Sequence, residues 1–267
     1  LTSRGPLLSD GEILDVIWQA SPTVADIDGD GLLALVTGSM YVSPSGGEAA
    51  PKDRPGLFMF RNVGTRTEPV LRQVPFPLEV AWVETFLLNP RFADWNGDGL
   101  LDLVVGAGVQ VSVYLNIGTP TEPRFSRQEP LRVPWVARMV HPDWMGDFDA
   151  DGRPDVYVTN HLSKPLLFRN LGDGRLADVT ADLFDQKQLE GDKHGAAWAD
   201  FDNDGRQDLV QLTGAVKGLG AEPKRLYRFD GARFEDVAPA MGALNPEGRT
   251  RMPLWLDIDH DGRLDLV

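Results

Sequence analysis

The chain has 267 residues, with 26 basic and 40 acidic side chains and a formal net charge of −14. A hydrophobic content of 42% is ordinary for a folded protein, so the composition argues against disorder and allows a sizeable core. The absence of cysteine excludes disulfides, thiolate catalysis and cysteine-ligated metal centres. The negative charge argues against a nucleic-acid partner, and no apolar stretch is long enough to span a membrane.

An acidic loop recurs five times along the chain. The loops begin at Asp26, Asp94, Asp147, Asp200 and Asp257, at intervals of 68, 53, 53 and 57 residues. A second landmark, an asparagine followed two residues later by glycine, recurs at Asn62, Asn116 and Asn170, 54 residues apart each time. Two independent markers with one period indicate a repeat architecture.

Short apolar runs accompany both landmarks. They follow the acidic loops at 32–36, 100–105, 154–158, 207–210 and 264–267, and they precede the asparagines at 57–60, 111–115 and 166–168. The run 111–115 alternates with period two, which is typical of a half-buried strand. The long first interval contains residues 41–56, whose proline, glycine and serine content predicts a surface loop. Each unit of about 55 residues therefore holds about four short strands, the content of one β-propeller blade.

We predict an all-β fold, a β-propeller of four-stranded blades. Residues 1–267 are predicted to form a single propeller domain or a propeller fragment, with repeat units beginning near residues 22, 90, 143, 196 and 253. A β-sandwich with metal sites is the alternative, but a sandwich gives no reason for a 54-residue repeat.

Oxygen-bearing side chains alternate within each acidic loop. Positions 1, 3 and 5 are Asp or Asn, position 6 is Gly, and position 9 is Asp except in the first loop, which has Ala34. Alternating side chains can turn toward one point while glycine permits a sharp reversal, and calcium takes about six to eight oxygen ligands in such a site. Magnesium fits less well, because it requires octahedral geometry and keeps its waters. The predicted metal ligands are Asp26, Asp28, Asp30, Asp94, Asn96, Asp98, Asp102, Asp147, Asp149, Asp151, Asp155, Asp200, Asp202, Asp204, Asp208, Asp257, Asp259, Asp261 and Asp265.

Up to five calcium ions are expected, and the first site is expected to be the weakest because Ala34 supplies no carboxylate. The position 7 carbonyls are expected to complete the ligand shells, from Leu32, Leu100, Arg153, Arg206 and Arg263. Plain Asp-Gly turns are the simpler interpretation, but a turn needs only one or two such residues, and crowded carboxylates repel one another. An EF-hand is rejected, because it requires Glu at position 12, where Thr37, Val105, Val158 and Gln211 stand. The loops hold 18 of the 40 acidic residues, so five divalent ions would bring the charge to −4.

The sequence resembles the FG-GAP/VCBS repeat family, the calcium-loop propellers that include the integrin α-subunit head. The resemblance is carried by Asp94-Trp-Asn-Gly-Asp-Gly-Leu-Leu-Asp-Leu-Val-Val-Gly-Ala, by Asp208-Leu-Val, and by Leu167-Phe-Arg-Asn-Leu-Gly-Asp-Gly-Arg-Leu-Ala-Asp-Val-Thr. The last segment is similar to the bacterial branch of the family, often found in secreted or cell-surface proteins. The resemblance implies a calcium-binding propeller. Ala34 departs from the family pattern.

The remaining residues give weaker indications of chemistry. Four histidines are present, His141, His161, His194 and His260, and none has a metal-ligand spacing or an evident nucleophile partner. His260 occupies position 4 of a loop, where a turn residue is the simpler interpretation, and His194 is the candidate for a channel-facing site. Recurrence of an aromatic residue two positions before a loop favours core packing for Phe92, Trp198 and Trp255. Trp82, Trp135 and Trp144 are better candidates for sugar stacking, and the basic stretch Lys217–Arg228 is predicted to be a solvated connection.

Three functional hypotheses follow. The favoured one is a non-catalytic extracellular, periplasmic or cell-surface module that is stabilised by calcium and presents loops to a glycan or protein ligand. The alternatives are a propeller scaffold of a carbohydrate-active enzyme, of lyase or dehydratase type, and a structural subunit of a larger surface assembly. No acid–base cluster is evident outside the acidic loops, which disfavours the enzyme.

The two ends of the chain do not supply a full repeat between them. The interior units use 45, 45 and 49 residues between position 9 of one loop and position 1 of the next, whereas Asp265 and Asp26 are joined by only 28 steps across the termini. Residues 12–17 resemble the outer strand that contains Phe234. We therefore expect the 267 residues to be part of a longer propeller, completed by further chain or by a partner.

Overall fold

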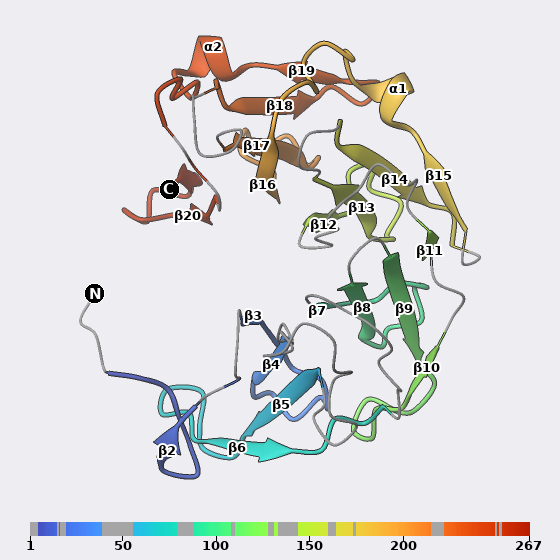
Figure 1. Ribbon diagram of the computed structural model, residues 1–267, viewed down its shortest axis with the longest axis vertical. Helices are drawn as coiled ribbons and strands as arrows, with labels where there is room; N and C mark the ends of the chain where they lie inside the picture. The colour runs from blue at the N-terminus through green and yellow to red at the C-terminus, as the bar shows by residue number, and fades with distance from the viewer. Residues whose placement is uncertain are drawn as a thin grey trace, which may run out of the picture. The chain divides into compact units, whose positions relative to one another are not determined.

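In the computed structural model the described residues form an all-β structure apart from two four-residue helices (Figure 1). It describes residues 5–14, 16, 20–38, 56–78, 88–107, 110–127, 131–132, 144–159, 164–172, 175–214, 222–248, 250 and 253–267. Outside the described residues lie 41–55 of the predicted surface loop 41–56, and also Trp82, Trp135, His141 and His161. Residues 1–94 and 98–131 form one compact unit, and residues 95–97 and 132–267 form a second.

The first unit contains two antiparallel sheets of the repeat type. One is built from β3 (Ser21–Ala25), β4 (Ala34–Gly38), β5 (Leu57–Asn62) and β6 (Leu71–Val74). The next is built from β7 (Leu88–Ala93), β8 (Asp102–Ala107), β9 (Gln110–Asn116) and β10 (Phe125–Arg127), and β11 (Leu131–Arg132) also pairs with β9. The hairpin of β1 (Leu8–Ser9) and β2 (Glu12–Ile13) extends the first sheet, because β1 pairs in parallel with β6.

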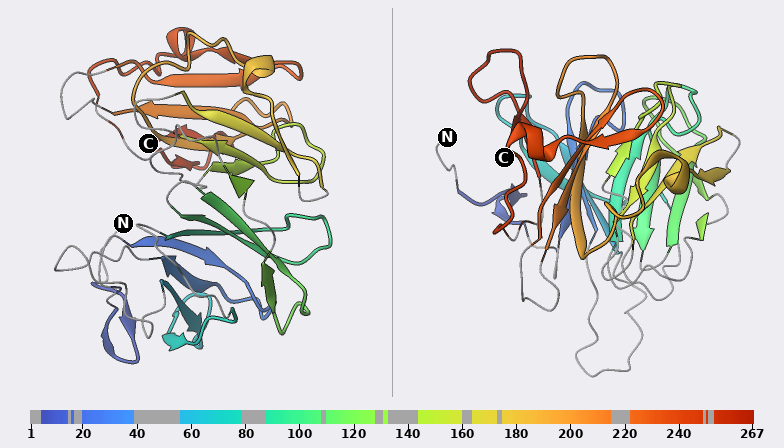
Figure 2. Two further views of the ribbon diagram at one scale, coloured as in Figure 1. Left: turned by 45° about the vertical axis from the view of Figure 1, so that its right-hand side comes forward. Right: turned by 90° about the horizontal axis from the view of Figure 1, so that it is seen from above.

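The second unit continues the same pattern (Figure 2). Its first sheet has β12 (Trp144–Gly146), β13 (Asp155–Val158), β14 (Leu166–Asn170) and β15 (Leu176–Asp178) in that order. The next has β16 (Lys193–Ala199), β17 (Asp208–Thr213), β18 (Arg225–Phe229) and β19 (Phe234–Asp236). The hairpin of β20 (Trp255–Leu256) and β21 (Asp265–Leu266) follows. The helices α1 (Thr180–Leu183) and α2 (Ala238–Met241) come directly after β15 and β19.

The acidic loops always join the first strand of a sheet to the second, which fixes their geometry. Each predicted apolar run after a loop overlaps a strand, and the position 12 residues lie in β4, β8, β13 and β17. The expectation of four short strands per repeat is confirmed in four sheets, and within the described residues strands rather than helices flank the loops, which excludes an EF-hand. The prediction of a solvated connection at Lys217–Arg228 is wrong for its last residues, because Arg225–Phe229 form β18 with Leu226 and Tyr227 buried. Residues 217–221 lie outside the described part of the chain.

The core of each unit lies between its neighbouring sheets. In the second unit, Tyr157 and Leu167 of one sheet join Leu209 and Tyr227 of the next in one buried cluster. Gly146 permits this packing, because a Cβ there would come within 2.5 Å of the Trp198 ring. In the first unit the corresponding cluster holds Val36, Met59, Leu103 and Tyr114, among others. Successive sheets within a unit therefore pack through apolar faces, with their loops fixed at the strand ends.

Candidate metal centres

Each acidic loop is closed by hydrogen bonds from its backbone to its own carboxylates. One oxygen of the position 1 aspartate accepts the N–H of the position 6 glycine at 2.8–3.0 Å in all five loops. In the last four loops its other oxygen accepts the N–H of position 5 at 2.9–3.0 Å. The position 5 carboxylate accepts the N–H of position 7 at 2.8–3.0 Å. These bonds hold the loops in one repeated conformation.

Two residues of every loop adopt left-handed backbone conformations. The position 6 glycines have φ between 82° and 86°, where a side chain would be strained. Position 4 has φ between 58° and 76°, and it is occupied by Gly29, Gly97, Ala150, Asn203 and His260. Asn tolerates this region best among residues with a side chain, and His is also enriched there. His260 is exposed, so its predicted role as a turn residue is confirmed.

The loop conformation brings three carboxylates together in four of the five loops. Their ligand atoms lie within 4.8 Å of one another in the groups Asp26, Asp28, Asp30; Asp147, Asp149, Asp155; Asp200, Asp202, Asp208; and Asp257, Asp259, Asp261. Within the described residues no such group of three carboxylates forms in the second loop, whose central ligand position is the amide Asn96. The aspartates predicted from sequence are therefore positioned for a shared cation at four sites.

Two buried carboxylate oxygens in the loops show whether a cation fits these sites. Oδ1 of Asp26 and Oδ1 of Asp149 are buried, and neither has a hydrogen-bond partner within the described structure. A buried carboxylate oxygen without a donor is costly unless a positive charge lies against it. Burial is the chief cause that raises the pKa of Asp149, and the neighbouring Asp151 and Asp147 add to it while Arg169 opposes it. The donor set consists of hard oxygens only, which suits calcium.

The position 9 aspartates have a second role, which sequence analysis did not identify. Asp155 is fully buried, and its two oxygens accept the N–H groups of Phe148 at 3.2 Å and Asn170 at 2.8 Å. Asp208 repeats this with Phe201 and Phe229. Desolvation raises the pKa of Asp155 to about 7 and that of Asp208 to about 6. Position 9 therefore ties the loop to the third strand of its sheet, and its charge is unfavourable in the absence of a nearby cation.

Arginine side chains neutralise part of the loop charge. Arg169 Nε lies 2.8 Å from Asp149 Oδ2, and Arg206 Nη2 lies 2.5 Å from Asp204 Oδ2. In the first loop Arg61 contacts Asp28 closely and lies 3.5 Å from Asp30, while position 9 is the buried Ala34. The first loop thus has a guanidinium against two carboxylates and one ligand fewer than its counterparts.

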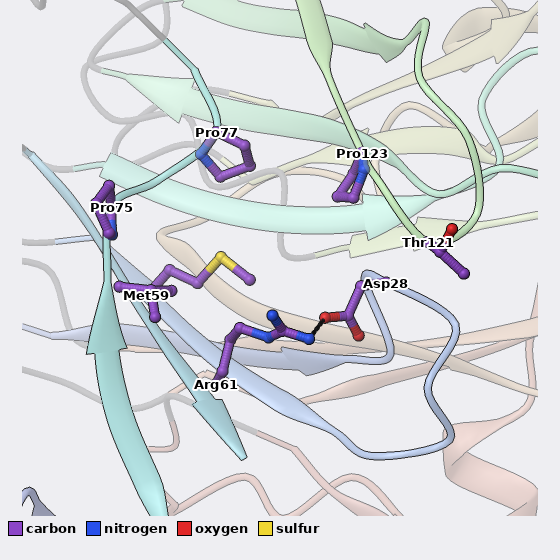
Figure 3. A pocket seen from close by; sticks show the side chains of 8 residues that line it. Asp28, Met59, Arg61, Pro75, Pro77, Thr121 and Pro123 are labelled. Atoms are coloured by element: carbon purple, nitrogen blue, oxygen red, sulfur yellow. Dashed lines mark ion pairs between the residues drawn. The ribbon is translucent and has the colours of Figure 1, made fainter. Parts of the chain in front are cut away.

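A shallow pocket of about 220 Å³ lies beside this first loop (Figure 3). Asp28 and Arg61 form its charged wall, and their ion pair is drawn there. Met59 and Pro123 are among the residues that form its apolar walls. The pocket exposes the ion pair to solvent, so a cation can reach Asp28 only by competing with Arg61.

The repeated asparagines close the turn between the third and fourth strands. Asn170 is fully buried, and its Oδ1 accepts the N–H of Gly172 at 2.9 Å while its Nδ2 donates to the carbonyl of Trp95 at 2.9 Å. Asn62 and Asn116 accept the equivalent N–H groups of Gly64 and Gly118. The sequence revealed the period of these residues, and the structure shows that the asparagine side-chain oxygen closes the following turn in these three repeats.

The structure tests the predictions for three aromatic residues and for His194. Core packing is confirmed for Trp198, which stacks on Phe148 at 6.4 Å, for Trp255, which stacks on Phe201 at 6.2 Å, and for Phe92 beside Phe125. His194 does have a carboxylate partner, since its Nε2 lies 3.0 Å from Asp192 Oδ2 and both side chains are buried. Sequence analysis missed this pair, although the two residues are only two positions apart. Among the described residues no helix is long and apolar enough to cross a membrane.

Comparisons with known proteins agree with the repeat. The sequence profile of the FG-GAP-like repeat family matches residues 147–210, which contain the third and fourth acidic loops. Cartilage acidic protein 1 of Xenopus tropicalis is 30% identical over an alignment of 132 residues that covers 46% of this chain. The chain spans only 19% of the length of that relative.

Two solved structures are also similar in part. A lectin of Agrocybe aegerita, described as recognising non-reducing terminal N-acetylglucosamine, has 19% identity and a TM-score of 0.47 over 80% of this chain and 50% of the lectin chain. Trypanosoma rangeli sialidase in complex with sialic acid has 12% identity and a TM-score of 0.47 over 92% of this chain and 43% of the sialidase chain.

Proposed function

We propose that this protein is a non-catalytic, calcium-stabilised binding or assembly module that acts outside the cytoplasm and presents its loops to a glycan or protein ligand. The observation that carries the calcium part is the convergence of inward carboxylates, two of which have a buried oxygen without a donor. The match of residues 147–210 to FG-GAP-like repeats supports the same proposal. In it, the repeat units beginning near residues 22, 90, 143, 196 and 253 belong to one β-propeller or to part of one.

Calcium would supply positive charge and rigidity to the loops, and no chemical step is assigned to it. Asp147, Asp149 and Asp155 would hold the ion in the third loop, and Asp200, Asp202 and Asp208 would do so in the fourth. Asp94, Asn96 and Asp98, with Asp102, would serve in the second loop, where one carboxylate is replaced by an amide. Because each loop joins the first two strands of a sheet, an ion there stabilises a strand pair and the surfaces at its ends.

The binding role is tested by an array of glycans and by affinity capture from the native source, each in calcium and in chelator. The proposal expects a retained glycan or protein that is released, or bound more weakly, when calcium is removed. The matched control is Asp182→Ala, which removes an exposed acidic residue of α1 outside the loops. Absence of any ligand in both formats, with correctly folded protein in calcium, would contradict the binding role.

A carbohydrate-active enzyme is the second candidate, because one observation favours it. The buried pair of His194 and Asp192 has the form of an imidazole oriented by a carboxylate, as in general acid–base catalysis. The test is turnover of acidic polysaccharides by the wild type and by His194→Gln. Activity that disappears in this variant, while calcium-dependent stability is kept, would replace the binding role by catalysis.

A further inference from the structure

The pocket beside the first acidic loop lies within the first unit and joins segments of its two sheets (Figure 3). Its walls come from β5, from the residues that follow β6, from the first acidic loop and from the turn between β9 and β10. Five of its eight lining residues are Met, Val or Pro, and the polar ones are Asp28, Arg61 and Thr121. The pocket therefore combines an apolar surface with one cationic group.

The turn that forms one wall of the pocket is fixed by its own hydrogen bonds. Oδ1 of Asn116 accepts the N–H of Gly118 at 3.0 Å and that of Arg124 at 3.1 Å. The first acidic loop packs closely against this turn, because a Cβ at Gly29 would lie 3.2 Å from the carbonyl oxygen of Pro120. The proline side chains of the pocket are rigid as well. A ligand therefore meets preformed walls and pays little for ordering them.

Arg61 is the cationic group of the pocket, and it keeps donors for a ligand. It is two positions from Met59 on β5, so both side chains lie on one face of the strand. The Arg61 side chain is 46% exposed, whereas that of its partner Asp28 is only 12% exposed. Both ion pairs of Arg61, to Asp28 and to Asp30, are made by Nη2, and within the described residues its Nε and Nη1 donate no hydrogen bond. Because a guanidinium has five N–H donors, it can bind a second carboxylate without releasing Asp28.

The size and lining of the pocket restrict the chemistry of its ligand. Its volume of about 220 Å³ is below the roughly 300–1,000 Å³ of sites for drug-sized ligands, so it takes a group of about one residue. A sugar ring would lose the hydration of its hydroxyl groups against proline and methionine side chains that offer no hydrogen bonds. A cationic ligand would be repelled by Arg61. The best match is an apolar group that carries one carboxylate.

We propose that this pocket binds the C-terminal residue of a partner polypeptide that ends in an apolar side chain, with the terminal carboxylate on Arg61. In such a residue the carboxylate and the apolar side chain are attached to the same carbon atom, as the neighbouring positions of Arg61 and Met59 on one strand face require. An aspartate or glutamate within a chain fits less well, because it has no apolar group beside its carboxylate. The proposal rests on the binding role proposed above and names the class of its ligand.

The experiment uses the full chain and two synthetic peptides, acetyl-Gly-Ser-Gly-Leu with a free carboxylate and the same peptide with a C-terminal amide. Binding is followed by nuclear magnetic resonance of the methionine methyl groups, in calcium and in chelator. The free-carboxylate peptide should shift the Met59 methyl resonance and leave that of Met241, an exposed residue of α2, unchanged. The amide peptide should bind at least about fivefold more weakly, because it lacks the charge that Arg61 binds.

Arg61→Gln should reduce the affinity for the free-carboxylate peptide to that for the amide. Arg228→Gln is the matched control, because Arg228 precedes Phe229 as Arg61 precedes Asn62, is 43% exposed and pairs with Glu235 at 2.9 Å outside the pocket. It should leave the affinity unchanged within about twofold. Absence of a Met59 shift, or equal affinity of the wild type for the two peptides, overturns the proposal. Thermal unfolding of the same samples in calcium and in chelator reports the calcium-dependent role separately, so the failure of either proposal can be recognised.

Discussion

Replacing Asp149 by alanine should abolish the calcium response of the third loop while leaving the metal-free protein nearly unchanged. One oxygen of Asp149 is buried without a hydrogen-bond donor, and the other pairs with the partly exposed Arg169. Loss of such an ion pair costs about 0–1 kcal/mol. Loss of one ligand from a site with few protein oxygens removes most of the binding. At a calcium concentration of about 100 times Kd, an intact site stabilises the native state by about 2.7 kcal/mol.

The assay is thermal unfolding of the wild type and of Asp149→Ala, each in calcium and in chelator. About 2.7 kcal/mol corresponds to a shift of roughly 5–11 °C in the unfolding midpoint, at about 2–4 °C per kcal/mol for a protein of this size. The variant should lose this shift in calcium and remain within a few degrees of the wild type in chelator. Asp182→Ala is the control and should follow the wild type in both. An equal loss for Asp149→Ala in calcium and in chelator would refute the reasoning, since the carboxylate would then be structural.

Three further predictions concern the other parts of the repeat. Ala34→Asp restores the position 9 carboxylate of the first loop and should tighten calcium binding there, whereas Ala34→Asn, of similar size, should do so less; calorimetry that gives equal affinities would contradict the ligand argument. Asn170→Ala removes bonds to Gly172 and Trp95 and should destabilise the protein by about 1–3 kcal/mol in calcium and in chelator alike, since the bond to Trp95 is buried whereas the exposed Gly172 can be hydrated. Burial lowers the pKa of Lys193 from 10.5 to about 8. Between pH 8 and pH 10.5 the unfolded chain therefore binds more protons than the native state, and the contribution of Lys193 to stability rises with pH over that range. Lys193→Met should therefore stabilise the chelated protein most at pH values below 8 and progressively less above, as measured by urea unfolding; a gain that does not change with pH would contradict this assignment.

The repeat and its loops could be predicted from sequence because both depend on local chemistry. Position 6 must be glycine for its left-handed backbone, and positions 1 and 5 must carry short acceptors to close the turn, so the pattern recurs with little variation. The strands after the loops were found for the same reason, since position 9 and the apolar residues after it enter the sheet core in every complete repeat.

The contacts made across the chain could not be read from the sequence. The third strand at Arg225–Phe229 was missed because Phe229 replaces the marker asparagine, although its N–H still donates to Asp208 at 2.8 Å. The pairing of His194 with Asp192 depends on the irregular start of β16, where the register with β17 shifts between Lys193 and Ala196. The Arg61 contact with Asp28 joins residues more than 30 positions apart through the pairing of β4 with β5. Such contacts follow from strand register, which residue spacing alone does not determine.

The central claim is that the acidic loops bind calcium, and the most direct measurement is the metal content of the full chain after equilibration with calcium and removal of free ions. Elemental analysis should find calcium at about four ions per chain, from the last four loops, of which the one at Asp94 uses the amide of Asn96 in place of a carboxylate. The first loop also brings three carboxylates together, but Arg61 pairs with Asp28 and Ala34 supplies no ligand, so that loop should fill only at higher concentration. Asp149→Ala and Asp202→Ala should each reduce the content by about one ion. Protein that retains no calcium, or the same content in both variants, would contradict the account.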